Sequence, residues 1–202
     1  MNKKNYLLDL NNSKKPFIIY KSDKGFDLYT DFSKKIILNN KNIEKFINKN
    51  TGLKSNHKET DLFIGFFGYE ILNNLINVKI KKQKTTNFPK GIFYKPETKI
   101  KFSNNLEYKK TRLSNPGNLF KININKKSYK IIFDKFKKKI KSGETYQIKI
   151  CTKYSNKSEI DALDFFSRLV KSNMAPEAFM IKDKDYSIIS CSPENLITKK
   201  GS

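Results

Sequence analysis

The sequence is poor in the residues that build metal centres, disulfides and phosphate-binding loops. Its 202 residues include 2 cysteines, 8 glycines and a single histidine, His57. Cys151 and Cys191 have neither a Cys-x-x-Cys spacing nor a histidine companion, so neither a metal site nor a disulfide is expected. His57 lies in a polar stretch, which argues against triad chemistry. No glycine-rich loop of the Walker or dinucleotide-binding type occurs.

Long hydrophobic runs are also missing. No stretch approaches the roughly 18–20 uninterrupted apolar residues of a membrane span, and the basic N-terminus has no sustained apolar segment of the signal-peptide kind. Hydrophobic residues make up 37% of the chain and aromatic residues 13%, which is enough for a folded core. We therefore expect a soluble, cytoplasmic protein without a membrane partner.

The charge is strongly one-sided, with 42 Lys+Arg against 19 Asp+Glu and a formal net charge of +23. Such an excess normally indicates nucleic acid or an anionic membrane. However, only Arg112 and Arg168 are arginine, the residue that makes bidentate contacts to phosphate and guanine. The lysine, together with abundant Asn and Ile, indicates a bias in the gene's base composition. No nucleic-acid partner is expected; the alternative, a nonspecific lysine-based binder, predicts affinity that falls steeply with salt.

The first half of the chain predicts short strands and few helices. Apolar runs predict strands at 17–20, 26–29, 91–94 and 99–102, the last two separated by Pro96. Helical spacing predicts a helix at 42–48, and residues 61–80 predict a buried strand that runs into a helix. Residues 103–125 are rich in Asn, Ser and Gly and predict an exposed connection between two halves.

The second half has a clearer pattern. A helix is predicted from a cap at Ser128 to Gly143, then an alternating strand at 145–154 and a helix whose apolar residues run from Ile160 to Val170. Strands at 178–181 and 186–190, joined by a polar hairpin, and at 195–198 follow. Because strands mostly follow one another, we expect an α+β fold, a layered antiparallel β-sandwich with helices on the outside, and not a doubly wound parallel sheet.

Four ordered pieces of the second half carry a resemblance. They are the helix leading into 141–147, the turn Asn173-Met-Ala-Pro176, a strand hairpin of fixed length, and 190–194 with the sequence S-C-S-P-E. In order and spacing they resemble the opening of the chorismate-binding domain of anthranilate synthase component I and aminodeoxychorismate synthase component I. Upstream, Gly65 to Glu70 is similar to the family's G-x-x-G-Y-[DE] element, and Leu7-Leu8-Asp9 to its L-L-[ED]-S motif.

The resemblance implies a domain organisation. Residues 1–125 resemble the N-terminal region of component I, and residues 126–202 resemble the beginning of a chorismate-binding domain whose fold is incomplete at the C-terminus. In the family, the catalytic and metal-binding residues follow the S-P-E signature, and this sequence ends at Ser202. We therefore expect a fragment that has no catalytic or metal-binding position and is inactive alone.

The resemblance also implies a reaction and partners. In the family, a glutamine amidotransferase subunit (component II) releases ammonia, and component I adds it to chorismate with the help of Mg²⁺. One branch gives anthranilate for tryptophan and the other gives aminodeoxychorismate for folate. The residues at 146–147, 175–176 and 189–190 resemble the corresponding residues of aminodeoxychorismate synthase slightly more than those of anthranilate synthase. The alternatives are anthranilate synthase, a salicylate- or isochorismate synthase-like enzyme, and a non-catalytic binding module.

One regulatory site of the family is implied in part. Anthranilate synthases bind tryptophan as a feedback effector, and the matching positions here are Leu10, Pro176, Glu177 and Ala178. Leu10 cannot supply the hydroxyl found in the family, and Glu177 and Ala178 replace an aromatic ring and a thioether that would pack an indole. These four residues are thus a weak effector-site prediction.

Overall fold

A computed structural model of the chain describes residues 3–50, 60–71, 88–102, 106, 120–158 and 160–192. Contacts divide the chain into two units. The first unit holds Met1–Lys109 together with Ala162–Ser202, and the second holds Lys110–Asp161. The organisation into domains at 1–125 and 126–202 stays a prediction.

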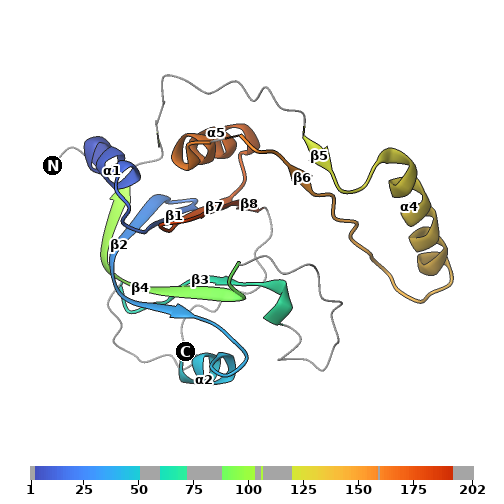
Figure 1. The fold of residues 1–202 in the computed structure, drawn as a ribbon, viewed down its shortest axis with the longest axis horizontal. Coiled ribbons are helices and arrows are strands. Elements are labelled where there is room, and N and C mark those ends of the chain that lie inside the picture. The colour runs from blue at the N-terminus through green and yellow to red at the C-terminus, as the bar shows by residue number, and fades with distance from the viewer. Residues whose placement is uncertain are drawn as a thin grey trace. The chain divides into compact units, whose positions relative to one another are not determined.

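The first unit is built on one curved antiparallel sheet (Figure 1). Its strands are β1 (Phe17–Ser22), β2 (Gly25–Ile37), β3 (Ile64–Phe67), β4 (Gly91–Phe102), β7 (Glu177–Lys182) and β8 (Ser187–Ser192). They are ordered β3-β4-β2-β1-β7-β8, and every neighbouring pair is antiparallel. The pairing of β1 with β7 joins the two ends of the sequence in one sheet. The predicted α+β class is confirmed.

Helices α1 (Lys3–Asn12) and α5 (Ala162–Asn173) contribute to a core on one face of this sheet. Phe17 and Ile19 of β1 lie in that core, whereas Ile18 belongs to a second cluster with residues of β2, β4 and β7. Because successive strand residues point to opposite faces, β1 is buried on both sides, which explains its unbroken apolar run. None of the described helices is long and apolar enough to cross a membrane.

Helix α2 (Ile43–Asn50) follows β2 and matches the predicted helix to within two residues at each end. The side chain of Asn42 accepts a hydrogen bond from the backbone N–H of Asn39 at 2.8 Å and donates one to the carbonyl of Ile37 at 2.9 Å. Ile43 is fully buried in a small cluster with Leu38 and Ile71, which belongs to the 3₁₀ turn η1 (Tyr69–Ile71). Polar and apolar contacts therefore both anchor the start of α2.

Two strand predictions differ from the structure. Strand β2 continues well past the predicted 26–29 to Ile37, and β4 is one continuous strand through Pro96, where two were predicted. Pro96 lies opposite Phe32, beside a register shift between Phe32 and Lys34. A proline has no N–H to donate, and an irregular point of the ladder is where strands tolerate it.

Helix α1 was not predicted, because its apolar residues follow no strong helical spacing. Ile160, expected on the apolar face of α5, lies before that helix and is exposed. His57, the helix predicted beyond Ile71, most of the predicted connection at 103–125 and the strand predicted at 195–198 lie outside the described residues.

The second unit contains β5 (Lys121–Ile122), α4 (Lys126–Lys141) and β6 (Tyr154–Ser155). The cap of α4 is Asn125, not Ser128 as predicted: its side chain accepts a hydrogen bond from the backbone N–H of Ser128 at 2.8 Å. Gly143, with a φ of 75°, lies just after the helix, as expected for a glycine that closes it.

The strand predicted at 145–154 is wrong. Among the described residues of this segment, only Tyr154 pairs, together with Ser155, in a short ladder with β5. The alternation of apolar and polar residues is present, but a strand also needs a neighbour for its N–H and C=O groups. In the described part of the second unit, β5 offers that neighbour over two residues alone.

Candidate functional site

The four predicted effector positions belong to α1, to the turn before β7 and to the start of β7. Leu10 and Ala178 belong to the same core cluster and are 7% and 2% exposed, respectively. Pro176 is exposed just before β7, and Glu177, its first residue, is half-buried. The structure thus places Leu10 and Ala178 in one core as buried apolar side chains.

Two polar residues of β1, Tyr20 and Lys21, contact this turn, and no local pattern indicated them. The Lys21 ammonium donates to the carbonyl of Ala175 at 2.7 Å and to that of Pro176 at 3.3 Å, which fastens the turn before β7. The Tyr20 hydroxyl hydrogen-bonds Glu177. Burial, followed by that hydrogen bond and the Glu177 charge, raises the pKa of Tyr20 to about 12. A cation, a carboxylate and a neutral phenol therefore surround this turn.

A second lysine ties α1 to the sheet. The Lys182 ammonium, at the end of β7, donates to the backbone carbonyl of Asn11 and, at 3.0 Å, to its side-chain oxygen. The end of α1 and the start of β7 are thus each held by a lysine that binds carbonyl oxygens. The arrangement of these groups stabilises the fold, and effector binding at Leu10, Pro176, Glu177 and Ala178 stays a prediction.

The glycines of the Gly65 to Glu70 element allow β3 to approach β4 closely. A Cβ atom on Gly65 would lie 1.9 Å from the carbonyl oxygen of Ile92, and one on Gly68 would lie 2.7 Å from that of Lys90. The backbone N–H of Gly68 donates to the same Lys90 oxygen at 2.6 Å. The spacing of this motif therefore serves strand packing, because no side chain fits at either glycine.

The turn Asn173 to Pro176 connects α5 to β7. Helix α5 ends at Asn173, and Met174 has a φ of 48°, a left-handed conformation that reverses the chain. The hairpin predicted between 173 and 192 is present as β7 and β8, with Ala178 opposite Cys191. Of the S-C-S-P-E segment, Ser190 to Ser192 belong to β8, whereas Pro193 and Glu194 lie outside the described residues.

A buried polar cluster surrounds Asp183, a residue of the hairpin that was predicted as polar, and no local pattern indicated it. Asp183 is 7% exposed; its carboxylate lies 2.5 Å from the Lys35 ammonium and accepts a hydrogen bond from the Tyr94 hydroxyl. The Tyr186 hydroxyl lies 3.5 Å from that of Tyr94. Lys35 and Asp183 are 148 positions apart, so no local pattern could have paired them.

The environment of this cluster shifts its proton equilibria. Burial by itself raises the pKa of Asp183, but hydrogen bonds from Lys35, Tyr94 and the backbone N–H of Lys184 outweigh burial, so the pKa lies below its ordinary value of 3.8. Burial and the hydrogen bond to Asp183 raise the pKa of Tyr94. The carboxylate stays charged and the phenol stays neutral, which suits a structural role.

No group of three or more His, Cys, Asp or Glu side chains that could hold a metal ion occurs among the residues the structure describes. Mg²⁺ prefers carboxylate and other oxygen ligands in octahedral geometry. The Mg²⁺ ion that the family resemblance implies for the full-length enzyme stays a prediction.

Fold, turn geometry and motif order thus define an α+β protein with an antiparallel sheet that carries the opening elements of a chorismate-binding domain. The chain matches the family described as chorismate binding enzyme over residues 3–202, and it belongs to that family.

A relative gives a more particular comparison. The chain is 26% identical over 183 residues to anthranilate synthase component 1 of Buchnera aphidicola subsp. Pemphigus spyrothecae, an alignment that covers 73% of this chain and 34% of that protein. The aligned part thus spans about a third of the length of the relative.

Proposed function

We propose that this chain is part of a component I subunit that aminates chorismate, and that the whole protein is an anthranilate synthase. The observation that carries the proposal is the family match over residues 3–202, together with the likeness to an anthranilate synthase component 1. The motifs at 141–147, 173–176 and 190–194 support it, since they follow one another in the family's order.

Aminodeoxychorismate synthase is the second candidate. It is favoured by the residues at the effector positions, because Leu10 has no hydroxyl and Glu177 and Ala178 offer neither an aromatic ring nor a thioether to a tryptophan effector. The sequences at 146–147, 175–176 and 189–190 also resemble those of aminodeoxychorismate synthase slightly more than those of anthranilate synthase. The two candidates share chorismate and ammonia as substrates and differ in whether pyruvate is eliminated.

The proposal includes a partner and a metal ion. A glutamine amidotransferase subunit would supply ammonia, and Mg²⁺ would neutralise the carboxylate of chorismate and polarise the departing hydroxyl. In this proposal, the present part of the chain contributes scaffold, because the catalytic and metal-binding residues of the family follow the S-P-E signature. The 202-residue chain by itself is expected to convert no chorismate.

The test is to read the gene on from the codon of Ser202 and to assay its complete product. The protein is supplied with chorismate, Mg²⁺ and ammonium, and anthranilate is followed by its fluorescence. In a parallel reaction, an added aminodeoxychorismate lyase converts any aminodeoxychorismate to 4-aminobenzoate. Glutamine in place of ammonium, with and without an amidotransferase subunit, tests the partner.

Each outcome separates the candidates. Anthranilate formation without the added lyase supports the anthranilate synthase proposal. Formation of 4-aminobenzoate that occurs only when the lyase is added supports the second candidate. If the complete gene product consumes no chorismate with ammonium and Mg²⁺, both are wrong. Turnover by the 202-residue chain above the blank would contradict the scaffold role.

A further inference from the structure

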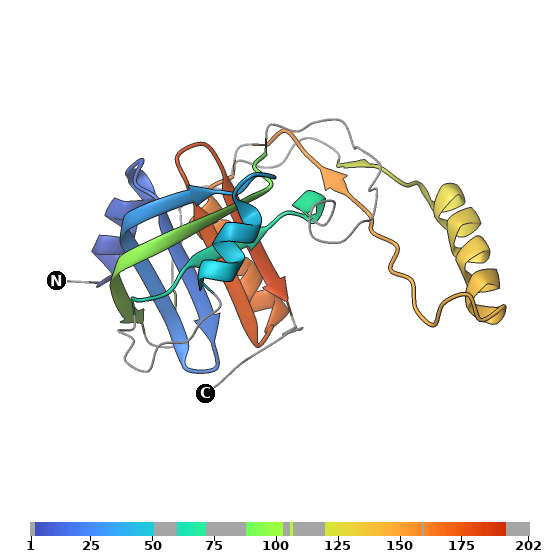
Figure 2. The same cartoon turned by 90° about the horizontal axis from the view of Figure 1, so that it is seen from below.

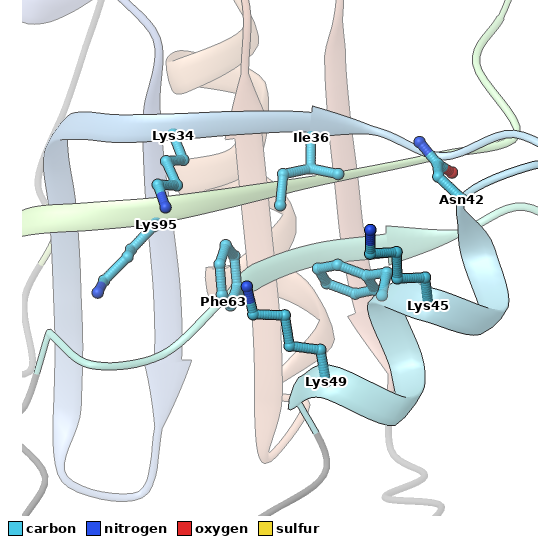
Figure 3. Close-up of a pocket in the computed structure, with 8 residues that line it drawn as sticks. Lys34, Ile36, Asn42, Lys45, Lys49, Phe63 and Lys95 are labelled. Atoms are coloured by element: carbon cyan, nitrogen blue, oxygen red, sulfur yellow. The ribbon is translucent and has the colours of Figure 1, made fainter.

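A cavity of about 370 Å³ lies on the first unit between β2, β4, α2 and the segment that leads into β3 (Figure 3). Part of its lining is apolar: the rings of Phe46 and Phe63 meet edge to face at 79°, with centroids 5.5 Å apart, and Ile36 lies beside them. The rest of its lining is mainly cationic. Four lysines surround it, namely Lys34, Lys45, Lys49 and Lys95.

These lysines come from three different elements and reach the same space. Figure 3 shows Lys45 and Lys49 extending from α2 toward the strands, and Lys34 extending from β2 toward Phe63. Lys95 forms an ion pair with Asp61 at 3.2 Å. For the other three lysines, no ion-pair partner occurs among the described residues. The cavity therefore has an excess of about three positive charges.

Like charges adjoin one another at this cavity, and Asp61 offsets the charge of Lys95 alone among the four lysines. Lys34 lies directly opposite Lys95 in the ladder between β2 and β4, and like charges in that relationship destabilise a sheet. Lys45 and Lys49 are four residues apart on α2, where like charges also repel. Although Lys34, Lys45 and Lys49 are exposed, the two like-charged pairs meet around one aromatic cavity, where an anion would relieve their repulsion.

We propose that this cavity binds a small molecule that carries a dianionic group, a phosphate or a pair of carboxylates, on an aromatic ring. The lysines neutralise the dianion, and the ring packs against Phe46 and Phe63. The volume lies within the range of small-molecule sites, which are mostly apolar with a few converging polar groups. All the lining residues belong to the first unit, so the cavity does not depend on residues of the second unit.

Phenyl phosphate is the probe, and its binding to the 202-residue chain is measured by the broadening of its proton resonances at low micromolar protein. The affinities of inorganic phosphate and phenol are measured by their competition with phenyl phosphate. Inorganic phosphate carries the charge without the ring, and phenol carries the ring without the dianion. We expect phenyl phosphate to bind about tenfold more tightly than either, and its affinity to fall with added salt.

Variants separate this cavity from the general lysine surface. The double variant Lys45→Gln, Lys49→Gln keeps the aliphatic stems and is expected to weaken phenyl phosphate binding about tenfold. The matched control Lys24→Gln, Lys184→Gln removes two exposed lysines of the same unit that do not line the cavity, and should change binding less than about twofold. Phe63→Leu should reduce the preference for phenyl phosphate over inorganic phosphate, with its thermal midpoint checked to confirm folding.

Two results would overturn the proposal. One is a phenyl phosphate affinity no greater than that of inorganic phosphate, which would mean that the rings contribute nothing. The other is an equal loss of binding in the Lys24, Lys184 control, which would mean that the whole basic surface attracts the probe.

Discussion

The hydroxyl of Tyr94 donates a hydrogen bond to the carboxylate of Asp183, and so joins β4 to the turn that follows β7. In the order of the sheet, β2 and β1 lie between these two strands. The curvature of the sheet, visible in Figure 2, lets a residue of β4 reach across. Lys35 of β2 binds the same carboxylate, so three strands depend on one buried charge.

Replacing Asp183 with Asn is expected to lower the free energy of unfolding by about 1–3 kcal/mol, because the Lys35 ammonium and the Tyr94 hydroxyl lose a charged partner inside the fold. Tyr94→Phe removes one hydrogen bond and should cost about 1 kcal/mol. Urea unfolding followed by circular dichroism measures both. The control is Asp185→Asn, an exposed carboxylate in the same turn, which should stay within about 0.5 kcal/mol of the unchanged protein. An equal effect at both positions would contradict the role of Asp183.

The lowered pKa of Asp183 predicts acid sensitivity. The carboxyl group binds a proton less readily in the folded chain than in the unfolded chain, so the stability it contributes is present above its ordinary pKa of 3.8 and is lost as the pH falls through the folded value. We expect the difference in unfolding free energy between the unchanged protein and Asp183→Asn to be constant from pH 7 to 5 and to shrink below pH 4. Urea unfolding at a series of pH values measures it. A difference that stays constant down to pH 2 would show that the charge of Asp183 contributes nothing.

The close approach of β3 to β4 predicts that Gly65 tolerates no side chain. An added methyl group would overlap the carbonyl of Ile92, so Gly65→Ala should cost roughly 2–4 kcal/mol, as for other overpacked positions. Gly143→Ala is the comparison: no atom lies within 4 Å of its Cβ position, and only the φ of 75° opposes it, which should cost about 1 kcal/mol. Thermal and urea unfolding give both values. If Gly143→Ala is the more damaging, backbone strain outweighs the steric clash.

Helix α4 predicts association of the isolated chain. It has no buried residue, and its apolar side chains Tyr129, Ile131, Phe133 and Ile140 are 41–62% exposed. Exposed apolar surface of this kind promotes aggregation. The double variant Ile131→Gln, Phe133→Gln should therefore reduce light scattering at a given concentration. Lys135→Gln, on the same helix, removes no apolar surface and should leave scattering unchanged; an equal decrease in both would show that the apolar residues are not responsible.

Local patterns predicted several elements well. The spacing of apolar residues predicted α2 and α5, the two apolar segments at 178–181 and 186–190 on either side of a polar hairpin predicted β7 and β8, and Gly143 predicted the end of α4. Each of these signals lies within one element and its caps, where the backbone's periodicity determines which side chains share a face. The motif order from 141 to 194 predicted the family for the same reason, since it lies in the sequence itself.

The predictions from sequence that differ from the structure concern residues whose hydrogen-bond or ion-pair partners lie far away in the chain. Residues 145–153 have the alternation of a strand but no neighbouring strand in the described part of their unit, whereas Pro96 is accommodated inside β4 because its partner strand is irregular at that point. The hairpin at 182–185 was predicted only as a polar turn, and the structure buries Asp183 against Tyr94 and Lys35. Hydrogen bonds between strands, and charges that meet across a sheet, depend on tertiary contacts that no local pattern contains.

The sequence by itself determined the class of fold, the helices and strands with clear periodicity, and the family. Only the tertiary structure decided that β1 and β7 are neighbours in one sheet, that Leu10 and Ala178 belong to one core cluster, and that four lysines from three elements meet around Phe46 and Phe63. The physical reason is that periodicity is a property of neighbouring residues, whereas burial and electrostatic repulsion depend on which distant residues the curved sheet brings together.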